Sequence, residues 1–228
     1  MTELWYGLIR AIQLIVSLDP EVMEIAGRSL AIAATSCAIT TLICLPLGSL
    51  VHFNRFPCKR FLINILQTLY SVPTVAIGLF VFVFLSRAGP LGDMGLMFTR
   101  TAIVIGQVIL ITPVILGLTI SALSGVGREV AETAVSLGAS RFQTVFIVLR
   151  EARFAILTAL IMGFGRAISE VGLSMMVGGN IKGFTRTITT AISLETSKGD
   201  IELSIALGII LIFLALVINI ALNRLQQR

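Results

Sequence analysis

Charged residues are scarce in this chain of 228 residues: 13% of positions are Asp, Glu, Lys or Arg, 56% are hydrophobic, and the mean hydropathy is +1.00. Soluble domains usually carry about 25% charged residues. The shortage therefore excludes an ordinary water-soluble fold and predicts a protein embedded in a bilayer. The net charge of +5 does not indicate a nucleic-acid partner, because the basic residues stand in short clusters between apolar runs, as expected next to lipid headgroups.

Side chains that serve catalysis or bind metals are also few. The chain has one histidine, His52, and three cysteines, Cys37, Cys44 and Cys58, which do not form a metal-binding pattern. No HExxH, GxSxG or GxxxxGK[ST] string occurs. We therefore expect no metal, no cofactor and no enzymatic activity in this chain, so any ATP hydrolysis must come from a separate subunit.

Long apolar runs are what the sequence has in abundance. Crossing the hydrocarbon core of a bilayer takes about 20 apolar residues in a helix, and at least four runs meet that length. The pattern predicts an all-α integral membrane protein with five transmembrane helices, at residues 27–51, 61–86, 101–123, 154–177 and 201–222. Pro73 should kink the second of these helices, and Pro113 lies inside the third.

The first residues form a different kind of element. Residues 4–18 are too short for a comfortable span, and their polar positions lie opposite an apolar stripe made of Trp5, Leu8, Ile12 and Ile15. This pattern predicts an interfacial helix that makes residues 1–20 a separate N-terminal element, ahead of a transmembrane domain at 21–228. Asp19 should cap the next helix, with Pro20 at its first position.

The orientation follows from the segment 124–153, which carries four arginines and three glutamates and cannot lie in lipid. With this segment in the cytoplasm, nine Lys and Arg residues lie inside against seven outside, the direction that the positive-inside rule favours. We expect a multi-pass protein of the cytoplasmic (inner) membrane with its N-terminus outside and its C-terminus in the cytoplasm. The inner basic set comprises Arg55, Lys59, Arg60, Arg128, Arg141, Arg150, Arg153, Arg224 and Arg228.

Within the polar segment, Gly138 permits a turn between two short helices, and Ser140 can cap the second. The string from Glu132 through Ala134 to Gly138 resembles the EAA loop of type I ABC importer permeases, which reads E-A-A, three residues, then G, ahead of the last two spans. The pair at 150–151 departs from that pattern, because Arg-Glu stands where an LP pair usually follows. An ordinary amphipathic cytoplasmic hairpin is the alternative.

The resemblance implies that this loop is a coupling helix, which docks in a groove of the nucleotide-binding subunit. Small residues suit such a groove, because they allow a short helix to approach closely. The positions that the resemblance assigns to ATPase coupling are Glu129, Ala131, Glu132, Ala134, Leu137, Gly138, Ala139, Ser140 and Arg141.

Two further strings, SVPTVAIGL at 71–79 and FGRAISEVGLSMMVGGNI at 164–181, resemble the tungstate permeases and, more loosely, the molybdate and sulfate permeases. The resemblance extends from Leu18 over nearly the whole chain and implies the MetI-like transmembrane domain of type I ABC importers. It implies an oxyanion importer with tungstate as the expected substrate, and molybdate or sulfate as alternatives. The implied partners are a second permease copy, two ABC ATPase subunits, an extracytoplasmic solute-binding protein and membrane lipid.

Two charges stand inside the fourth predicted span. Arg166 and Glu170 are one helical turn apart, so each can neutralise the other where a lone central charge costs about 3 kcal/mol. We expect the pair to hold two packed helices in register near the pathway or the dimer interface, with a purely structural ion pair as the alternative. Pro73, Thr74 and Ser169 are assigned with the pair to the pathway or its gate. We expect pairing rather than direct anion binding, because a strong site inside a pore would slow release of the ion.

Residues 178–199 form a hydroxyl-rich loop by their composition. Lys182, Thr185 and Arg186 offer hydrogen-bond donors to a tetrahedral dianion or to a binding protein, although a plain solvated loop has the same composition. An ion-coupled secondary transporter is the rival from another class. No inverted repeat is detectable in the sequence, which disfavours that rival.

Overall fold

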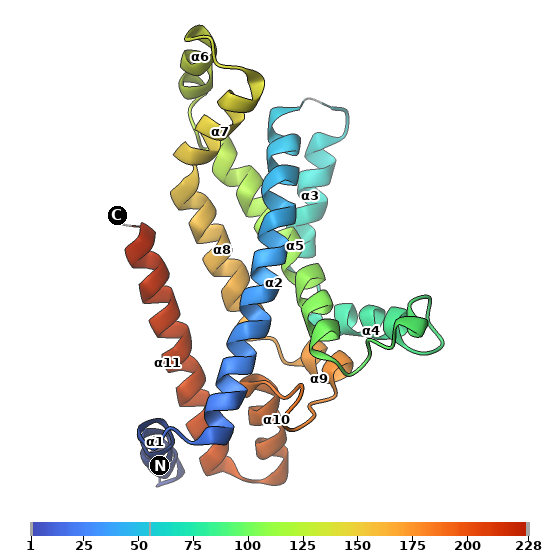
Figure 1. Ribbon diagram of the computed structural model, residues 1–228, viewed down its shortest axis with the longest axis vertical. Coiled ribbons are helices and arrows are strands. Elements are labelled where there is room, and N and C mark those ends of the chain that lie inside the picture. Colours follow the sequence, from blue (N-terminus) through green and yellow to red (C-terminus); the bar gives the residue numbers. More distant parts are fainter. Residues whose placement is uncertain (1, 55, 227–228) are drawn as a thin grey trace.

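Helices make up the regular structure of the chain, seen here as a computed structural model that describes residues 2–54 and 56–226. Within these residues there are eleven α-helices, one short 3-10 helix and no β-strand, so the expected all-α class is confirmed. Most helices run along the long axis of the molecule, whereas α4 projects to one side (Figure 1). Two members of the inner basic set, Arg55 and Arg228, lie outside the described residues.

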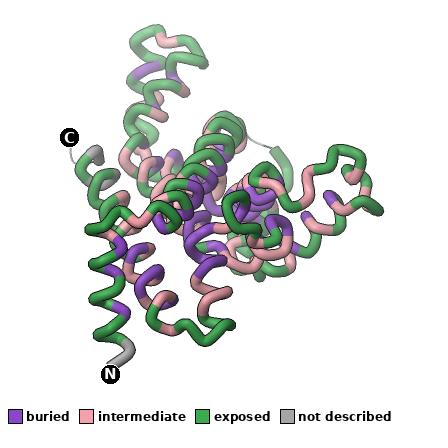
Figure 2. The backbone as a smooth tube through the Cα atoms, turned by 60° about the horizontal axis from the view of Figure 1, so that its bottom comes forward, coloured by how far each residue is buried: buried purple, intermediate pink, exposed green. Residues whose placement is uncertain are grey.

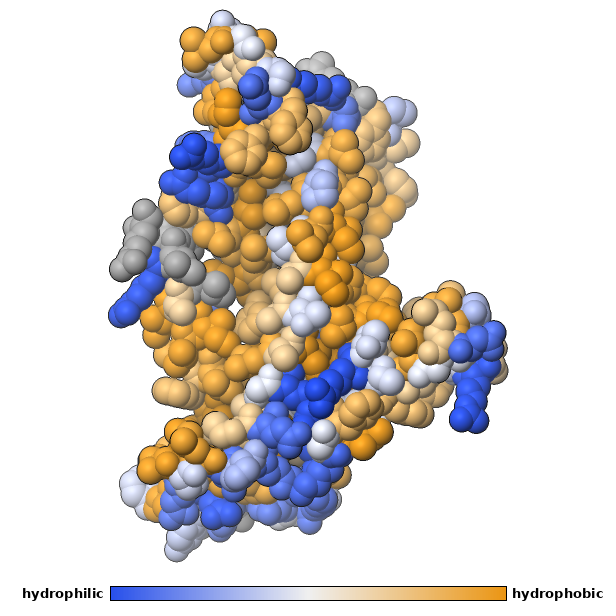
Figure 3. Space-filling view, in the orientation of Figure 1, coloured by the Kyte–Doolittle hydropathy of each residue, from blue (hydrophilic) through white to orange (hydrophobic). Residues whose placement is uncertain are grey.

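Three unbroken helices are long and apolar enough to cross a membrane: α2 (Pro20–Phe53), α5 (Arg100–Ser124) and α11 (Ile201–Gln226). The total for the described chain reaches five when each of two bent helix pairs counts as one span, in agreement with the sequence. Figure 3 shows hydrophobic residues over the middle of one face, and hydrophilic residues gathered toward its two ends. This is the distribution expected of a protein that spans a bilayer.

The second span is broken rather than kinked. Helix α3 (Lys59–Leu69) and helix α4 (Thr74–Leu85) meet at 99°, so α4 projects sideways from the bundle (Figure 1). Pro73 has no N–H group and disfavours helical backbone at Val72, and tight turns from Tyr70 to Val72 close the end of α3. The sequence predicted a kink within one helix, whereas the structure has two separate helices at this point, so the predicted kink is wrong. A 3-10 helix, η1 (Gly92–Met94), follows in the next loop.

The fourth span is also broken, and here the predicted continuous helix is wrong. Helix α8 (Arg153–Ile168) ends, and α9 (Gly172–Gly178) begins after a three-residue interruption with a bend of 59°. The interruption, 169–171, contains neither proline nor glycine. Side chains from other helices stabilise it instead, as described below.

The hydroxyl-rich segment 178–199 is not a loop throughout, which corrects the sequence prediction. It contains α10 (Ile188–Lys198), which begins at a capping box formed by Thr187 and Thr190. Ile188 and Ala191 are buried in a cluster with residues of α11. The hydroxyl groups that indicated a solvated loop therefore include those that start a packed helix.

The N-terminal helix α1 (Thr2–Val16) packs against α11, with Ala11 and Leu14 buried in the same cluster. Trp5 and Ile12 on the other side are exposed. The helix itself is confirmed, while its position at the bilayer surface stays a prediction. Asp19 caps α2 as expected, because its carboxylate accepts a hydrogen bond of 3.1 Å from the N–H of Val22.

The broken halves of the two spans pack against each other and against α5. Leu173 of α9 is fully buried between glycines of two other helices. A Cβ atom on Gly106 of α5 would lie 2.6 Å from Leu173 Cδ2, and one on Gly78 of α4 would lie 3.0 Å from Leu173 Cα. Glycine at these two positions therefore permits the close approach of three helices. Figure 2 shows buried residues gathered along the middle of the bundle.

Candidate functional site

The polar segment forms a helical hairpin at one end of the molecule (Figure 1). Helix α6 (Arg128–Ser136) and helix α7 (Arg141–Glu151) are joined by a turn in which Gly138 has a φ of +86°, a backbone conformation that favours glycine. Ser140 caps α7 in a reciprocal capping box with Gln143. The predicted arrangement of helix, glycine turn and capped helix is confirmed.

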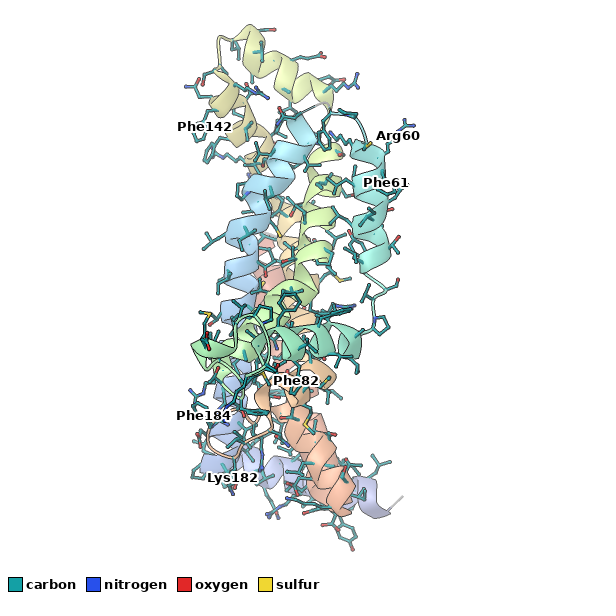
Figure 4. The ribbon with its side chains drawn as sticks, turned by 90° about the vertical axis from the view of Figure 1, so that its right-hand side faces the viewer. Arg60, Phe61, Phe82, Phe142, Lys182 and Phe184 are labelled. Carbon is teal, nitrogen blue, oxygen red and sulfur yellow. The ribbon has the colours of Figure 1, made fainter. Side chains whose placement is uncertain are left out.

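The tip of the hairpin exposes large apolar side chains. Leu137 is 83% exposed and Phe142 is 81% exposed, and together with Phe146 they line a cavity of about 480 Å³. Figure 4 shows Phe142 on the hairpin, at the opposite end of the molecule from Lys182 and Phe184. The two phenylalanines were missed at the sequence level. Their spacing of four residues within a polar segment is the signal that could have found them.

The residues assigned to coupling divide into two groups. Leu137, Gly138 and Ala139 line the cavity at the tip, whereas Glu129 and Glu132 on α6 and Ser140 at the start of α7 are exposed. Ala134 is buried and Ala131 is half-buried, so these two pack inside the hairpin rather than on its surface. Arg141 donates a hydrogen bond of 2.6 Å to Asn54 Oδ1 and so ties α7 to the end of α2.

The interruption between α8 and α9 has polar partners for its backbone. Gln107 Nε2 on α5 donates to the carbonyl oxygen of Ala167 at 3.0 Å, and Thr189 Oγ1 on α10 donates to the carbonyl oxygen of Glu170 at 2.8 Å. The Glu170 carboxylate accepts from the N–H of Leu173 at 2.8 Å. All of these groups are buried, and in a bilayer such freed backbone groups must find partners within the protein.

The expected ion pair between Arg166 and Glu170 is not formed. Helix α8 ends at Ile168, between the two residues, so they no longer share one helical face. The Glu170 carboxylate instead holds the first turn of α9. Within the described residues Arg166 forms no ion pair, and its Nε atom is buried without a hydrogen-bond partner. Ser169 is exposed and donates back to the carbonyl oxygen of Gly165 at 2.8 Å.

The two interruptions lie next to each other although they are far apart in the sequence. Pro73 and Thr74 begin α4, and Gly172 begins α9. A Cβ atom on Gly172 would lie 2.9 Å from Val75 Cγ2 and 3.8 Å from Thr74 Oγ1. The fold therefore brings together Pro73, Thr74 and Glu170, which the sequence placed near a gate without indicating that they meet.

At the opposite end, the predicted donors of the outer loop are largely committed to partners. Lys182 Nζ lies 2.8 Å from Glu21 Oε2, and Arg186 Nη1 lies 4.0 Å from Glu21 Oε1. Thr185 is buried, donates to the carbonyl oxygen of Gly178 and accepts from the N–H of Ile181, so it stabilises the loop rather than offering a surface donor.

The sequence analysis also missed a buried arginine in this region. Arg28 on α2 is 5% exposed, pairs with Glu24 and donates to the carbonyl oxygen of Arg186 at 2.8 Å. It therefore ties the outer loop to α2. Arg28 stands inside an apolar stretch, directly after Gly27, and this position could have indicated a buried charge from the sequence.

A groove of about 690 Å³ runs between α5 and α8 near the hairpin. Its walls are mainly small residues, among them Ser121 and Ala122 of α5, Gly125 directly after it, and Ala155 and Ala159 of α8; the larger Met162 of α8 also lines it. Both helices therefore contribute walls to the groove.

The buried amide of Gln107 gives a direct test of the broken span. In Gln107→Leu the carbonyl of Ala167 loses its side-chain donor, and the Ser36 hydroxyl loses its hydrogen bond to Gln107 Oε1; two buried hydrogen bonds of this kind together contribute about 1–3 kcal/mol. We expect the free energy of unfolding in detergent to fall by that amount. Gln67→Leu on the exposed face of α3 is the control, and its effect should stay within about 0.5 kcal/mol. Equal effects of the two substitutions would contradict this role of Gln107.

The sequence has relatives of known function. It is 41% identical over 221 residues to the tungstate uptake system permease protein TupB of Peptoclostridium acidaminophilum, with 97% of each chain covered. The TupB of Campylobacter jejuni is 38% identical, with 97% of this chain and 92% of that protein covered. The matched lengths therefore cover almost the whole of this chain.

A solved structure and a family model also match this chain, and both come from transport proteins, as the TupB relatives do. The inward-facing MetNI methionine ABC transporter has a chain that superposes with a TM-score of 0.75 at 18% identity, covering 92% of this chain and 97% of that one, which shows the fold. Residues 44–228 match the description "binding-protein-dependent transport system inner membrane component". This chain therefore belongs to the family of binding-protein-dependent transport system inner membrane components.

Proposed function

We propose that this chain is the permease subunit of an ABC importer that carries tungstate inward across the cytoplasmic membrane, driven by ATP hydrolysis in separate subunits. The identity of 41% to a tungstate uptake permease, over 97% of both chains, is the observation that carries the proposal. Residues 21–228 form the transport domain, and residues 1–20 lie at the membrane surface. The hairpin faces the cytoplasm, the N-terminus lies outside, and a solute-binding protein delivers the ion to the outer end.

The hairpin tip is the ATPase-docking surface in this proposal. Exposed large apolar side chains at the tip of a polar hairpin are costly in water and indicate a protein partner. Leu137, Phe142 and Phe146 are arranged around one cavity, which suits insertion of the tip into a groove on the partner. The rival, a plain amphipathic hairpin, offers no reason for two phenylalanines to face solvent.

A continuous path of helix joins this surface to the broken span. Helix α7 ends at Glu151 and α8 begins at Arg153, and the backbone hydrogen bonds of Ala152 and Ile156 continue across the boundary. Val148 and Ile156 are buried with Leu123 of α5 in one cluster at the base of the hairpin. A displacement of the hairpin by the ATPase therefore moves α8, which ends at the interruption.

The gate of the importer is the place where the two interruptions meet, at Pro73 and Thr74 on one side and Ser169 and Glu170 on the other. Short helices that end in the membrane can tilt without breaking the long helices that hold the bundle together. Two copies of the chain enclose the pathway, and each copy contributes its groove between α5 and α8.

Docking can be tested at two positions of the hairpin. Gly138→Val forces a β-branched residue into a backbone conformation with positive φ, and Phe142→Ala removes an exposed apolar side chain from the docking surface. Each substitution should weaken ATPase binding by about 2 kcal/mol, which is roughly a thirtyfold loss of affinity. The measurement is titration of the purified ATPase onto the permease in nanodiscs. Phe61→Ala is the matched control, because Phe61 is 65% exposed on α3, away from the hairpin (Figure 4). Unchanged affinity in both hairpin variants would contradict docking at this surface.

The substrate can be tested with the complete importer. Permease, ATPase and tungstate-binding protein are reconstituted in liposomes, and uptake of tungstate is measured with ATP present or absent. We expect uptake to depend on ATP. Excess tungstate should suppress this uptake, whereas excess sulfate should change it by less than twofold. Suppression by molybdate or sulfate at equal concentration would assign the importer to those anions instead. Uptake driven by an ion gradient without ATPase would support the secondary transporter and overturn the proposal.

A further inference from the structure

Arg166 has a positive charge that nothing in the described part of the chain neutralises. Glu170, the acid that the sequence offers as its partner, uses its carboxylate on the N–H of Leu173. The guanidinium forms no ion pair within the described residues, and its Nε atom is buried without a hydrogen-bond partner. Ionisable groups inside a membrane are costly and are normally paired, so a counter-charge from outside this chain is expected.

The face of α8 that carries Arg166 does not resemble a lipid-facing surface. Its exposed positions follow each other along one stripe at Ala155, Thr158, Met162 and Ser169, and Arg166 lies four residues after Met162 and three before Ser169. Helix α11 instead exposes large apolar residues, namely Ile212, Phe213, Leu216, Val217 and Ile220. Apart from Met162, the side chains of this stripe are small or polar and suit water or protein, whereas the α11 surface suits lipid tails.

The groove between α5 and α8 leads along this stripe toward Arg166. Ala155, Ala159 and Met162 of α8 line the groove, and Arg166 follows one helical turn beyond Met162. A Cβ atom on Gly165, the residue before Arg166, would have no neighbour within 4 Å, so there is open space beside the backbone at this point of α8. Arg166 therefore stands where the groove approaches the interruption after Ile168.

We propose that Arg166 is the anion contact of the pathway, where the guanidinium groups of two copies together neutralise one tetrahedral oxyanion dianion as it passes the gate. The proposal rests on the function proposed above. One dianion carries two negative charges and two arginines carry two positive charges, so the site is neutral when it is filled. The planar guanidinium also matches pairs of oxygen atoms on such an anion.

This assignment replaces the ion pair expected from the sequence and meets the objection that a strong site would trap the ion. Arg166 is only partly buried, so the guanidinium keeps part of its hydration. A partly hydrated site binds the anion weakly and releases it readily. Selection among anions then remains with the binding protein, and Arg166 contributes to passage.

The test compares Arg166→Gln, Arg166→Lys and the control Arg87→Gln in the complete importer in liposomes. Arg87 is an exposed arginine in the loop after α4, so its substitution removes the same charge elsewhere. Tungstate uptake, ATP hydrolysis stimulated by the loaded binding protein, and assembly by size-exclusion chromatography are measured for each variant. The number of ATP molecules hydrolysed per tungstate transported separates a role in passage from a role in coupling.

We expect Arg166→Gln to lower uptake at least tenfold while ATP hydrolysis and assembly stay within twofold of the unsubstituted protein. Arg166→Lys, which keeps the charge, should retain at least a third of the uptake, and Arg87→Gln should match the unsubstituted protein. Uptake by Arg166→Gln above half of normal, equal losses in the Gln and Lys variants, or loss of assembly would each overturn the proposal. Failure of the unsubstituted importer to transport tungstate would instead overturn the proposed function.

Discussion

The need to satisfy backbone polar groups inside hydrocarbon governs this structure. Two spans are broken at mid-length, and an unpaired N–H or C=O in lipid costs several kcal/mol. Around the interruption at 169–171, side chains of Gln107, Glu170 and Thr189 take the places of the missing helical hydrogen bonds. Because these partners come from three different segments, the broken helix is held by the whole bundle. This explains how a membrane helix can end where the proposed gate requires it to end.

The same constraint separates rigid parts from parts that can move. The long helices α2 and α5 pack around a buried cluster that includes Leu173, which two glycines admit at close range. Short helices α4 and α9 pack on this frame, and α8 joins α9 directly to the hairpin of α6 and α7. In the proposed importer, movement of the hairpin reaches the pathway through α8. The frame is built from unbroken helices, in which Pro46 of α2 and Pro113 of α5 each remove one helical hydrogen bond.

The sequence predicted best what local chemistry determines. The Asp19 cap, the Gly138 turn and the Ser140 cap depend on neighbouring residues, so each could be placed correctly. The break after Ile168 could not, because its stabilising groups come from residues about 20 to 60 positions away in the chain. The ion pair of Arg166 and Glu170 failed for the same reason, since it assumed a continuous helix. Whether a side chain such as Phe142 faces solvent or the core also depends on packing that sequence periodicity does not contain.

The central claim is that the stripe along α8 lines a hydrated pathway while α11 faces lipid. It is tested most directly by single cysteines at Ala155, Met162, Ile212 and Leu216, placed in a permease whose Cys37, Cys44 and Cys58 are replaced and assembled with its partners in a membrane. Their reaction rates with a charged, water-soluble thiol reagent are then compared. The account predicts rapid reaction at 155 and 162 and little reaction at 212 and 216. Slow reaction on α8 together with rapid reaction on α11 would contradict it.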